Sequence, residues 1–397
     1  MSFERLLAEL DELKTAGLLR TRLVVEGPQG PRISLDGREY LAFCSNDYLG
    51  LANDPRVAQA LIQAVQRDGV GAGASHLVTG HNAAHERLEH ALAQFAGLPR
   101  ALFFSTGYLA NIGVITALAG REDTIVSDAL NHASLIDGIR LSRAQVARVA
   151  HCDVAACRGA LARSQGRARF VVTEGVFSMD GDIAPLAELL ELCERFDAWL
   201  VVDDAHGFGV LGEAGRGVLE HFGLNSPRIV YIGTLGKAAG VSGAFVAGAA
   251  PVVETVLQRA RSYIYTTASP PFLCGALQTS LAIIGEESWR RRKLRALIAE
   301  LRRALPQLAA SQTPIQPLIL GGNAEALAAS ARLREQGIIV TAIRPPTVPA
   351  GSARLRISLS AAHDAADVAR LVAALREPGA AGTPWQAASS SPARTPA

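Results

Sequence analysis

Lys237 is the residue whose type and position in the sequence most clearly indicate a chemical role. It follows a short apolar stretch, Arg228 to Ile232, and a turn of small residues, Gly233-Thr234-Leu235-Gly236. Side chains placed after such a strand lie at the carboxyl end of a sheet, where open α/β sheets bind ligands. A hydroxyl there suits a phosphate and an amine suits a Schiff base. The nucleotide loop GxxxxGK[ST] is excluded, because the glycine spacing is wrong and Ala238 stands where that loop needs a hydroxyl.

Other predicted strand ends also deliver polar groups. The strand that ends at Phe104 is followed by Ser105-Thr106-Gly107-Tyr108, and the strand that ends at Val126 is followed by His132. The strand that ends at Val172 is followed by Thr173 to Gly181, and the strand that ends at Val202 by Asp203-Asp204-Ala205-His206. Taken alone, each group has an ordinary structural explanation, such as a helix cap, a buried ion pair or a core histidine. Together, an acid, an imidazole, a helix start that can bind phosphate and a lysine suit pyridoxal 5'-phosphate (PLP). The lysine forms the Schiff base, and the acid keeps the pyridine nitrogen protonated.

From about residue 100, apolar strands alternate with helical segments. The expected strands are 101–104, 124–126, 147–149, 170–173, 199–202, 229–232 and 244–247. Continuous apolar strands joined through helices predict an α/β fold with a mostly parallel, seven-stranded sheet covered on both faces.

The chain of 397 residues is long enough for two or three domains. We expect an N-terminal helix with short strands (1–50), a large cofactor-binding domain (51–285), a smaller α+β domain (286–376) and a disordered tail rich in Ala, Ser, Pro and Gly (377–397). Within the smaller domain, residues 338–343 are expected to form one strand. The basic run Arg290 to Lys293 is interpreted as a solvated helix face rather than a phosphate site.

Composition narrows the classes of function. A hydrophobic fraction of 49% and a net charge of +2 describe a globular protein without a basic field for nucleic acid. The five cysteines form no CxxC pair and indicate reduced thiols. No signal peptide or membrane span is expected, which favours a cytoplasmic protein. His81 and His85 could share a helix face, but no third ligand is evident, so we interpret them as solvated or capping residues and predict no metal site.

Several motifs resemble those of the α-oxoamine synthases, fold-type I PLP enzymes with an aminotransferase-like fold. The resemblance spans roughly residues 1 to 375 and is strongest at 45–51, 173–181, 203–207, 234–237 and 342–351. The chain departs from the family at Ala74-Ser75-His76-Leu77, where several relatives have an arginine.

The resemblance implies a role for individual residues. Lys237 holds PLP and removes the amino-acid Cα proton, Asp203 pairs with the pyridine nitrogen, and His132 stacks on the ring. The remaining cofactor positions are His206 at the ring hydroxyl, Gly107, Tyr108, Ser178 and Thr234 at the phosphate, and Thr266 and Thr267, which reach a neighbouring subunit's site. The substrate positions are Asn46 and Arg356 at the amino-acid carboxylate and Arg20 and Thr347 at the acyl group. The resemblance therefore also implies a homodimer in which each active site contains residues of both subunits.

The resemblance also implies an activity. The motifs at 45–51 and 342–351 favour a member that condenses L-alanine with a pimeloyl thioester, releasing CO2 and a thiol, in biotin biosynthesis. The acyl donor is a CoA thioester or an acyl-carrier protein. One alternative is the same chemistry with glycine and a short acyl-CoA, as in 2-amino-3-ketobutyrate CoA ligase. Another is a catalytically idle binding module, against which Lys237, Asp203 and His132 argue.

Overall fold

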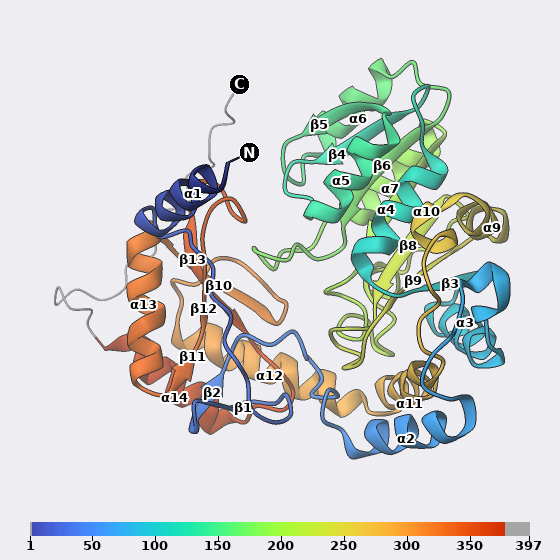
Figure 1. The fold of residues 1–397 in the computed structure, drawn as a ribbon. Coiled ribbons are helices and arrows are strands. Elements are labelled where there is room, and N and C mark those ends of the chain that lie inside the picture. The colour runs from blue at the N-terminus through green and yellow to red at the C-terminus, as the bar shows by residue number, and fades with distance from the viewer. Residues whose placement is uncertain (1, 378–397) are drawn as a thin grey trace. The chain divides into compact units, whose positions relative to one another are not determined.

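The computed structural model describes residues 2–377, which form two compact units (Figure 1). The larger unit comprises residues 47–178 and 182–292, and the described part of the smaller unit comprises residues 2–46, 179–181 and 293–377. The domain boundaries expected at residues 50 and 285 stay a prediction. The predicted disordered tail lies outside the described residues, apart from Glu377.

A seven-stranded sheet forms the centre of the larger unit. Its strand order is β3-β9-β8-β7-β6-β4-β5. β9 runs antiparallel to both of its neighbours, β3 and β8, and the pairs from β8 to β5 are parallel. The strands are β3 (Arg100–Phe104), β4 (Thr124–Asp128), β5 (Gln145–Val149), β6 (Arg169–Glu174), β7 (Ala198–Asp203), β8 (Ile229–Thr234) and β9 (Ala244–Gly248). The predicted mostly parallel sheet of seven strands is confirmed, and each apolar run matches one strand.

Helices bury the apolar residues of this sheet. One core joins Val172, Val201 and Ile232 of the strands to Val114 of α4 and Leu135 of α5; Figure 1 shows these two helices side by side. The helices of the larger unit are α2 (Pro55–Asp68), the π-helix η1 (His76–Gly80), α3 (Ala83–Ala96), α4 (Gly107–Leu118), α5 (Ala133–Ser142), α6 (Val154–Arg163), α7 (Leu186–Arg195), α8 (Val218–Phe222), α9 (Ala250–Arg259), α10 (Arg261–Ile264) and α11 (Phe272–Glu286). Parallel strands linked by such helices place their carboxyl ends at one edge, where a site can form.

The smaller unit contains two three-stranded sheets. One has the order β1-β2-β11, from β1 (Arg32–Leu35), β2 (Arg38–Ala42) and β11 (Ile338–Ile339). The other has the order β10-β13-β12, from β10 (Ile315–Gly321), β13 (Ala353–Ser358) and β12 (Thr341–Ile343). Its helices are α1 (Phe3–Thr15), α13 (Asn323–Glu335) and α14 (Ala365–Arg376), together with α12 (Ser288–Ala304) from Lys293 onward, since the first five residues of α12 belong to the larger unit.

The expected single strand at 338–343 is wrong. Ile338 and Ile339 pair with β2, whereas Thr341 to Ile343 pair with β13 of the other sheet. The chain therefore changes sheets at Val340, and an unbroken run of apolar and β-branched residues does not reveal such a change.

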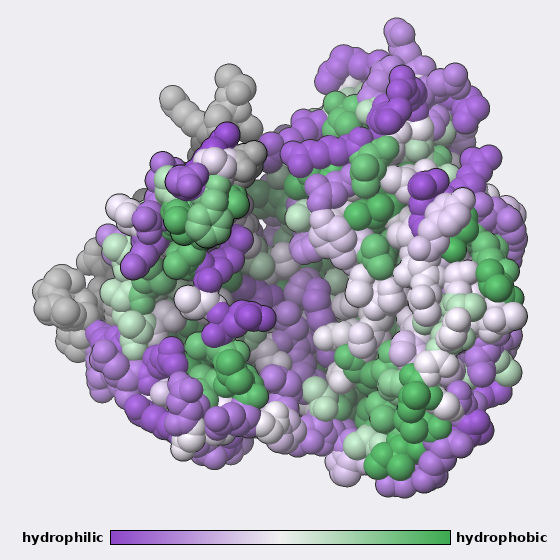
Figure 2. Space-filling view, viewed as in Figure 1, coloured by the Kyte–Doolittle hydropathy of each residue, from purple (hydrophilic) through white to green (hydrophobic). Residues whose placement is uncertain are grey.

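Helix α1 has an apolar face that other described residues do not bury. Phe3, Leu7 and Leu10 are 71%, 49% and 50% exposed, and no residue of the helix is buried. Figure 2 shows green apolar atoms gathered over this helix. Among residues 2–377, no helix has both the length and the apolar character that a bilayer crossing requires.

The solvated face expected for Arg290 to Lys293 is wrong for its first two arginines. Arg290 is 9% exposed and donates to Asp54 Oδ2 (3.1 Å) and to the Leu49 carbonyl (2.8 Å). Arg291 is 1% exposed and donates to the carbonyl of Glu213 (2.6 Å). The planar guanidinium suits such forked contacts, so both cations hold the fold together instead of facing solvent.

Candidate active site

A cavity of about 310 Å³ and one of about 220 Å³ occur in the larger unit, and the smaller of the two lies at the carboxyl ends of β7 and β8. It brings together seven of the residues predicted from the sequence. Its lining includes Gly107, Tyr108, His132, Asp203, His206, Thr234 and Lys237. Residues that the sequence reasoning did not single out complete it, among them Asn111, Ser134 and Glu174.

Lys237 lies in a hydrogen-bonded row with two other side chains. Its Nζ is 2.9 Å from Nε2 of His206, whose Nδ1 is 2.6 Å from the hydroxyl of Tyr48. His206 and Tyr48 are 4% and 0% exposed. The amine is therefore held at a fixed point in the cavity by groups that can both give and accept a proton.

The turn that begins at Lys237 requires a glycine at position 240. The N–H of Gly240 bonds the Lys237 carbonyl at 2.8 Å, and Gly240 adopts a φ of +71°. A Cβ at Gly240 would lie 2.5 Å from the backbone of Leu51 and Ala52. Only glycine fits this combination of a left-handed conformation and close backbone contact.

Asp203, at the end of β7, is 6% exposed and is held from two sides. Its Oδ1 accepts from the N–H of Ala205 at 3.0 Å, and its Oδ2 accepts from Nδ2 of Asn111 at 2.6 Å. Asn111 belongs to α4 and is 2% exposed. These donors fix the orientation of the carboxylate at the cavity.

The hydrogen bonds of His132 determine which ring nitrogen carries its proton. Nδ1 accepts from the backbone N–H of Ser134 (3.2 Å) and lies 2.7 Å from the Ser134 hydroxyl, which accepts from Asn111. The proton therefore resides on Nε2, which is left as a donor. Burial lowers the pKa of His132, with the Lys237 charge adding to this and Asp203 opposing it, so the ring is neutral near pH 7.

Glu174 is a buried acid that lies beside Asp203 on the neighbouring strand. It is 3% exposed and pairs with Asp203 in the register of β6 and β7. Burial, reinforced by the charge of Asp203, raises the pKa of Glu174 well above its usual value. The protonated acid receives backbone hydrogen bonds from Ser178 (3.2 Å) and His132, so it ties together two segments that border the cavity.

Backbone amides at the start of α4 form the other end of the cavity. Thr106 caps this helix, and the first amides of any helix lack an intrahelical acceptor. A Cβ on Gly107 would lie 3.7 Å from the Thr234 hydroxyl, so the helix start and the end of β8 face each other closely. A hydroxyl opposite a helix N-terminus is suited to a phosphate.

Other predicted site residues lie outside this cavity. Ser178 is held beside it through Glu174, and Thr267 pairs with Ser75 in an isolated bridge, next to Thr266. In the smaller unit, Nη1 of Arg356 donates to Oδ1 of Asn46 at 3.1 Å. Also in the smaller unit, Arg20 and Thr347 line one cavity of about 440 Å³.

His151 anchors the segment that leads to Ser178. Its Nδ1 is 3.1 Å from Asp128 and its Nε2 is 2.8 Å from Asp182, and its ring meets Phe177 edge-on with centroids 4.3 Å apart. Burial alone would lower the pKa of His151, but the hydrogen bonds to Asp128 and Asp182 outweigh it and raise the pKa to about 12. The ring is therefore a cation clamped between two carboxylates.

We expect His151→Asn to destabilise the fold by about 3 kcal/mol, because two carboxylates lose their shared cation. The folded pKa of about 12 exceeds the ordinary value of 6.5, so the stabilisation is complete below pH 6.5 and declines as pH rises toward 12. Urea midpoints at about pH 6 and about pH 10 test this, with His221→Asn on the exposed surface as control. An identical loss of stability at both pH values would contradict the clamp.

The cavity in the larger unit fits PLP by the chemistry of its donors. Asp203 supplies an oriented carboxylate, Lys237 an amine, and His206 and His132 two imidazoles, while Thr234 and the start of α4 supply phosphate donors. Asn111 Oδ1 and Glu174 Oε1 are buried without a protein partner in the described chain.

Comparisons with known proteins agree with this geometry. Residues 38–375 match the family of class I and II aminotransferases. The chain is 61% identical to 8-amino-7-oxononanoate synthase of Nitrosospira multiformis over 364 residues, which are 91% of this chain and 92% of that protein. Serine palmitoyltransferase of S. paucimobilis, solved with bound PLP–myriocin aldimine, superposes with a TM-score of 0.87 at 33% identity over 94% of this chain and 96% of that one.

A second solved structure belongs to the same group as the sequence relatives. 8-Amino-7-oxononanoate synthase of Francisella tularensis superposes with a TM-score of 0.74 at 31% identity over 84% of this chain and 96% of that one. The sequence match, the fold and the donor set of the cavity all lead to one conclusion. The chain belongs to the PLP-dependent class I and II aminotransferase family and, within it, to the 8-amino-7-oxononanoate synthases.

Proposed function

We propose that this chain condenses L-alanine with a pimeloyl thioester to give 8-amino-7-oxononanoate, CO2 and a free thiol, a step of biotin biosynthesis, with the residue roles set out below. The observation that carries these roles is the cavity that Lys237, Asp203 and His132 line together. The relationship to 8-amino-7-oxononanoate synthases supports the choice of substrates.

Lys237 and Asp203 perform the acid–base and electrostatic parts of the reaction. Bound PLP supplies an acceptor for the electron pair that remains on Cα when its proton is removed. The amine of Lys237 holds the cofactor, then takes the Cα proton of alanine and later returns it. The carboxylate of Asp203 keeps a positive charge on the pyridine nitrogen, and its fixed bonds to Ala205 and Asn111 mean that it needs no reorientation.

His132 acts on the acyl part of the reaction. His132 would lie against the ring of bound PLP. Because its proton lies on Nε2, it can donate a hydrogen bond to the ketone oxygen. Charge develops on that oxygen when the Cα carbon attacks the thioester and again when CO2 leaves, so a preorganised donor lowers both barriers. His206 would bind the ring hydroxyl of PLP, and its Nε2 lies 2.9 Å from the Lys237 amine.

The carboxylate of L-alanine is held by Arg356 and Asn46. Arg356 is 6% exposed and also donates to the hydroxyl of Ser358 at 2.9 Å, so its guanidinium has a fixed orientation. A planar guanidinium binds a carboxylate through two parallel hydrogen bonds. Holding the carboxylate fixes the orientation of the bonds to Cα.

We expect Arg356→Lys to raise the KM for L-alanine about 10- to 100-fold with a smaller change in kcat, because a lysine loses the forked contact worth about 1.5–3 kcal/mol. Steady-state kinetics with varied alanine measure this. Arg370→Lys, on the exposed surface of α14, is the control. An unchanged KM would remove Arg356 from the amino-acid site.

The acyl chain is placed in the cavity that Arg20 and Thr347 line in the smaller unit. Leu18, Leu19 and Ile343 provide apolar wall, and Arg20 provides a charge for the terminal carboxylate of the pimeloyl group. We also propose a cytoplasmic location, as expected from the sequence.

We also propose a homodimer in which Thr266 and Thr267 serve the neighbouring subunit's phosphate. Neither residue lines the Lys237 cavity of its own chain, and Thr267 is held by Ser75 instead. Analytical ultracentrifugation gives the assembly state. Mixing Lys237→Ala subunits with Thr266→Ala/Thr267→Ala subunits tests sharing, because a mixed dimer regains one complete site only if these threonines act across the interface.

Thiol release from pimeloyl-CoA, with L-alanine and glycine in parallel, tests the whole proposal. We expect the PLP-loaded protein to release thiol with alanine and to form 8-amino-7-oxononanoate. Release only with glycine and acetyl-CoA would transfer the function to the glycine-using branch, since one methyl is worth only about 1–3 kcal/mol in an apolar pocket. No thiol release with CoA substrates, together with turnover of pimeloyl-acyl-carrier protein, would show that the acyl donor is the carrier-protein thioester.

A further inference from the structure

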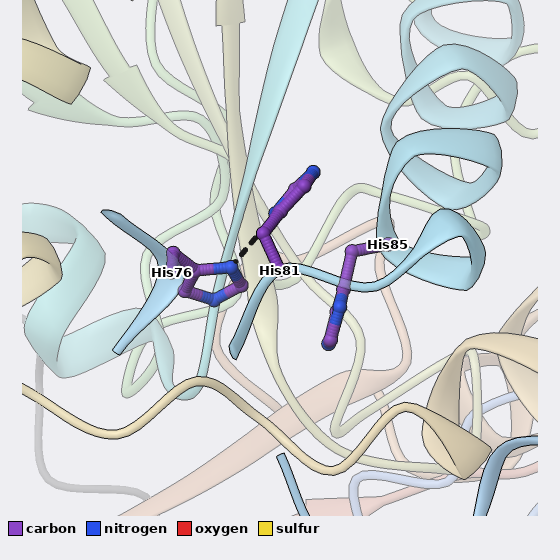
Figure 3. A group of neighbouring side chains, drawn as sticks. All are labelled: His76, His81 and His85. Carbon is purple, nitrogen blue, oxygen red and sulfur yellow. Dashed lines mark hydrogen bonds between the residues drawn. The ribbon is translucent and has the colours of Figure 1, made fainter. Parts of the chain in front are cut away.

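Three histidines gather near the start of α3 (Figure 3). His76 begins η1, His81 follows this helix directly and His85 lies in the first turn of α3. His81 and His85 were expected to share a helix face; this is wrong, because α3 begins only at Ala83. Nδ1 of His76 and Nδ1 of His81 are 2.9 Å apart and share a hydrogen bond.

The capping role predicted for these histidines is confirmed for His85. Its Nδ1 accepts from the N–H of Asn82 at 2.9 Å, and its Nε2 donates to the Ser269 carbonyl at 2.8 Å. The second ring nitrogen of His81, Nε2, lies 3.1 Å from Oε2 of Glu86. These bonds are structural, because they tie the start of α3 to its neighbours in the larger unit.

A row of hydrogen bonds at the Lys237 cavity connects two groups that the proposed reaction uses separately. Nδ1 of His132 lies 2.7 Å from the hydroxyl of Ser134. That oxygen accepts from Nδ2 of Asn111 at 2.8 Å, and the same amide group donates to Oδ2 of Asp203 at 2.6 Å. Asn111 and Ser134 are 2% and 0% exposed. Since both residues are shielded from water, their hydrogen-bond partners are those within the row.

The direction of the row is set at its His132 end. A backbone N–H can only donate, and the N–H of Ser134 bonds Nδ1 of His132 at 3.2 Å, where the imidazole caps α5. Nδ1 therefore carries no proton, and the Ser134 hydroxyl donates its single hydrogen to the same nitrogen. The serine oxygen is then the acceptor in its bond with Asn111.

The amide of Asn111 extends this direction to Asp203. Its Nδ2 carries two hydrogens, of which one goes to Ser134 and the other to Asp203. An amide turned the other way would place its oxygen against two oxygen atoms, Oγ of Ser134 and Oδ2 of Asp203. One arrangement of protons satisfies the whole row: His132 is protonated on Nε2, and Oδ2 of Asp203 carries no proton.

We propose that Asn111 and Ser134 are positioning residues of the condensation, which hold His132 as an Nε2–H donor and Oδ2 of Asp203 as an unprotonated oxygen through one shared row of hydrogen bonds. The reaction needs both states at once, because His132 donates to the ketone oxygen while Asp203 pairs with a protonated nitrogen. The inference rests on the proposed function for this use of the two groups, whereas the row itself does not depend on it.

The two positioning residues have different expected effects. Ser134 bonds His132 directly but reaches Asp203 only through Asn111, whereas Asn111 is a direct partner of Asp203. Loss of the Ser134 hydroxyl should therefore impair the acyl step and spare removal of the Cα proton. Loss of the Asn111 amide should impair both. A purely structural role would lower both steps together in either variant.

Nitrogen NMR of the PLP-loaded protein, with isotope label in its nine histidines, tests the row directly. The signals of His132 are those that disappear in His132→Gln. We expect Nδ1 of wild-type His132 to resonate as an unprotonated nitrogen that accepts a hydrogen bond. We expect this resonance to shift in Ser134→Ala and in Asn111→Leu, which keeps a similar side-chain shape and acts on His132 through the serine.

Kinetics measure the separation of the two roles. In Ser134→Ala we expect kcat for condensation to fall about 2- to 10-fold, as for the loss of one neutral hydrogen bond, while exchange of the alanine Cα proton in D2O keeps its rate. In Asn111→Leu both rates should fall. Ser142→Ala, which alters a buried serine at the other end of α5, and Thr116→Val on α4 are the matched controls.

Two NMR outcomes would overturn the proposal. One is a protonated Nδ1 in wild-type His132; the other is a His132 signal that is unchanged in both variants. Far-UV circular dichroism and the absorbance of bound PLP establish that each variant is folded, and Ser134→Ala, which removes only a hydroxyl, covers the case in which Asn111→Leu fails to fold. Failure of the proposed condensation leaves the NMR result unaffected, because that measurement needs neither alanine nor a thioester.

Discussion

Lys237→Ala is expected to abolish turnover, with a fall in kcat of more than about 10⁴-fold, and to remove the visible absorbance band of the covalently held cofactor. The variant loses both the amine that holds PLP and the base that takes the Cα proton, and proton transfer by a positioned group is alone worth about 10²–10⁴-fold. The His206 ring, 2.9 Å away, keeps its bond to Tyr48 and cannot replace an amine. Absorbance spectra and the thiol-release assay measure both effects.

The small number of lysines makes a direct check possible. The chain contains only Lys14, Lys237 and Lys293. Borohydride reduction of the PLP-loaded protein followed by peptide mass spectrometry should place the cofactor on Lys237, and Lys293→Ala serves as the control variant with normal spectrum and turnover. Label on another lysine, or full turnover without Lys237, would end the assignment.

Asp203→Asn is expected to lower kcat about 10³-fold while PLP still binds. The amide keeps the size of the side chain but cannot hold a proton on the pyridine nitrogen, and loss of one preorganised electrostatic group costs about 10²–10³-fold or more. It also presents an N–H₂ group to Ala205 or to Asn111, both of which now donate to the carboxylate.

Exchange of the Cα proton of L-alanine in D2O, without acyl thioester, isolates the step that Asp203 supports. We expect exchange to slow in parallel with kcat in Asp203→Asn. Asp197→Asn, an exposed acid paired with Arg228, is the control and should exchange at the wild-type rate. Wild-type exchange in Asp203→Asn would show that the carboxylate does not govern proton removal.

The strands of the larger unit and the residues at their ends could be predicted, because both follow from local patterns. A run such as Leu200-Val201-Val202 is apolar throughout, since parallel strands are buried on both faces, and polar residues directly after it must lie at the carboxyl edge. Asp203, His206 and Thr234 are therefore found by position alone. Lys237 follows from the same reasoning applied to β8.

The supporting groups could not be predicted, because their partners are remote in sequence. Tyr48 bonds a histidine 158 positions away, and Asn111 bonds an aspartate 92 positions away. Asn111 is an amide residue in a mostly apolar helix, which is the signal that could have found it. For Glu174, the last residue of β6, the position at a strand end could be predicted, but not its burial beside Asp203.

The predicted cofactor-binding and substrate-binding residues are distributed unequally between the two units. Every predicted PLP position lies in the larger unit, whereas four of the five substrate positions, Arg20, Asn46, Thr347 and Arg356, lie in the smaller one. With the roles predicted here, substitutions in the smaller unit would alter which amino acid and which acyl chain are joined and leave the cofactor chemistry unchanged. Such a division of labour allows a family to diversify its products without reinventing its catalyst.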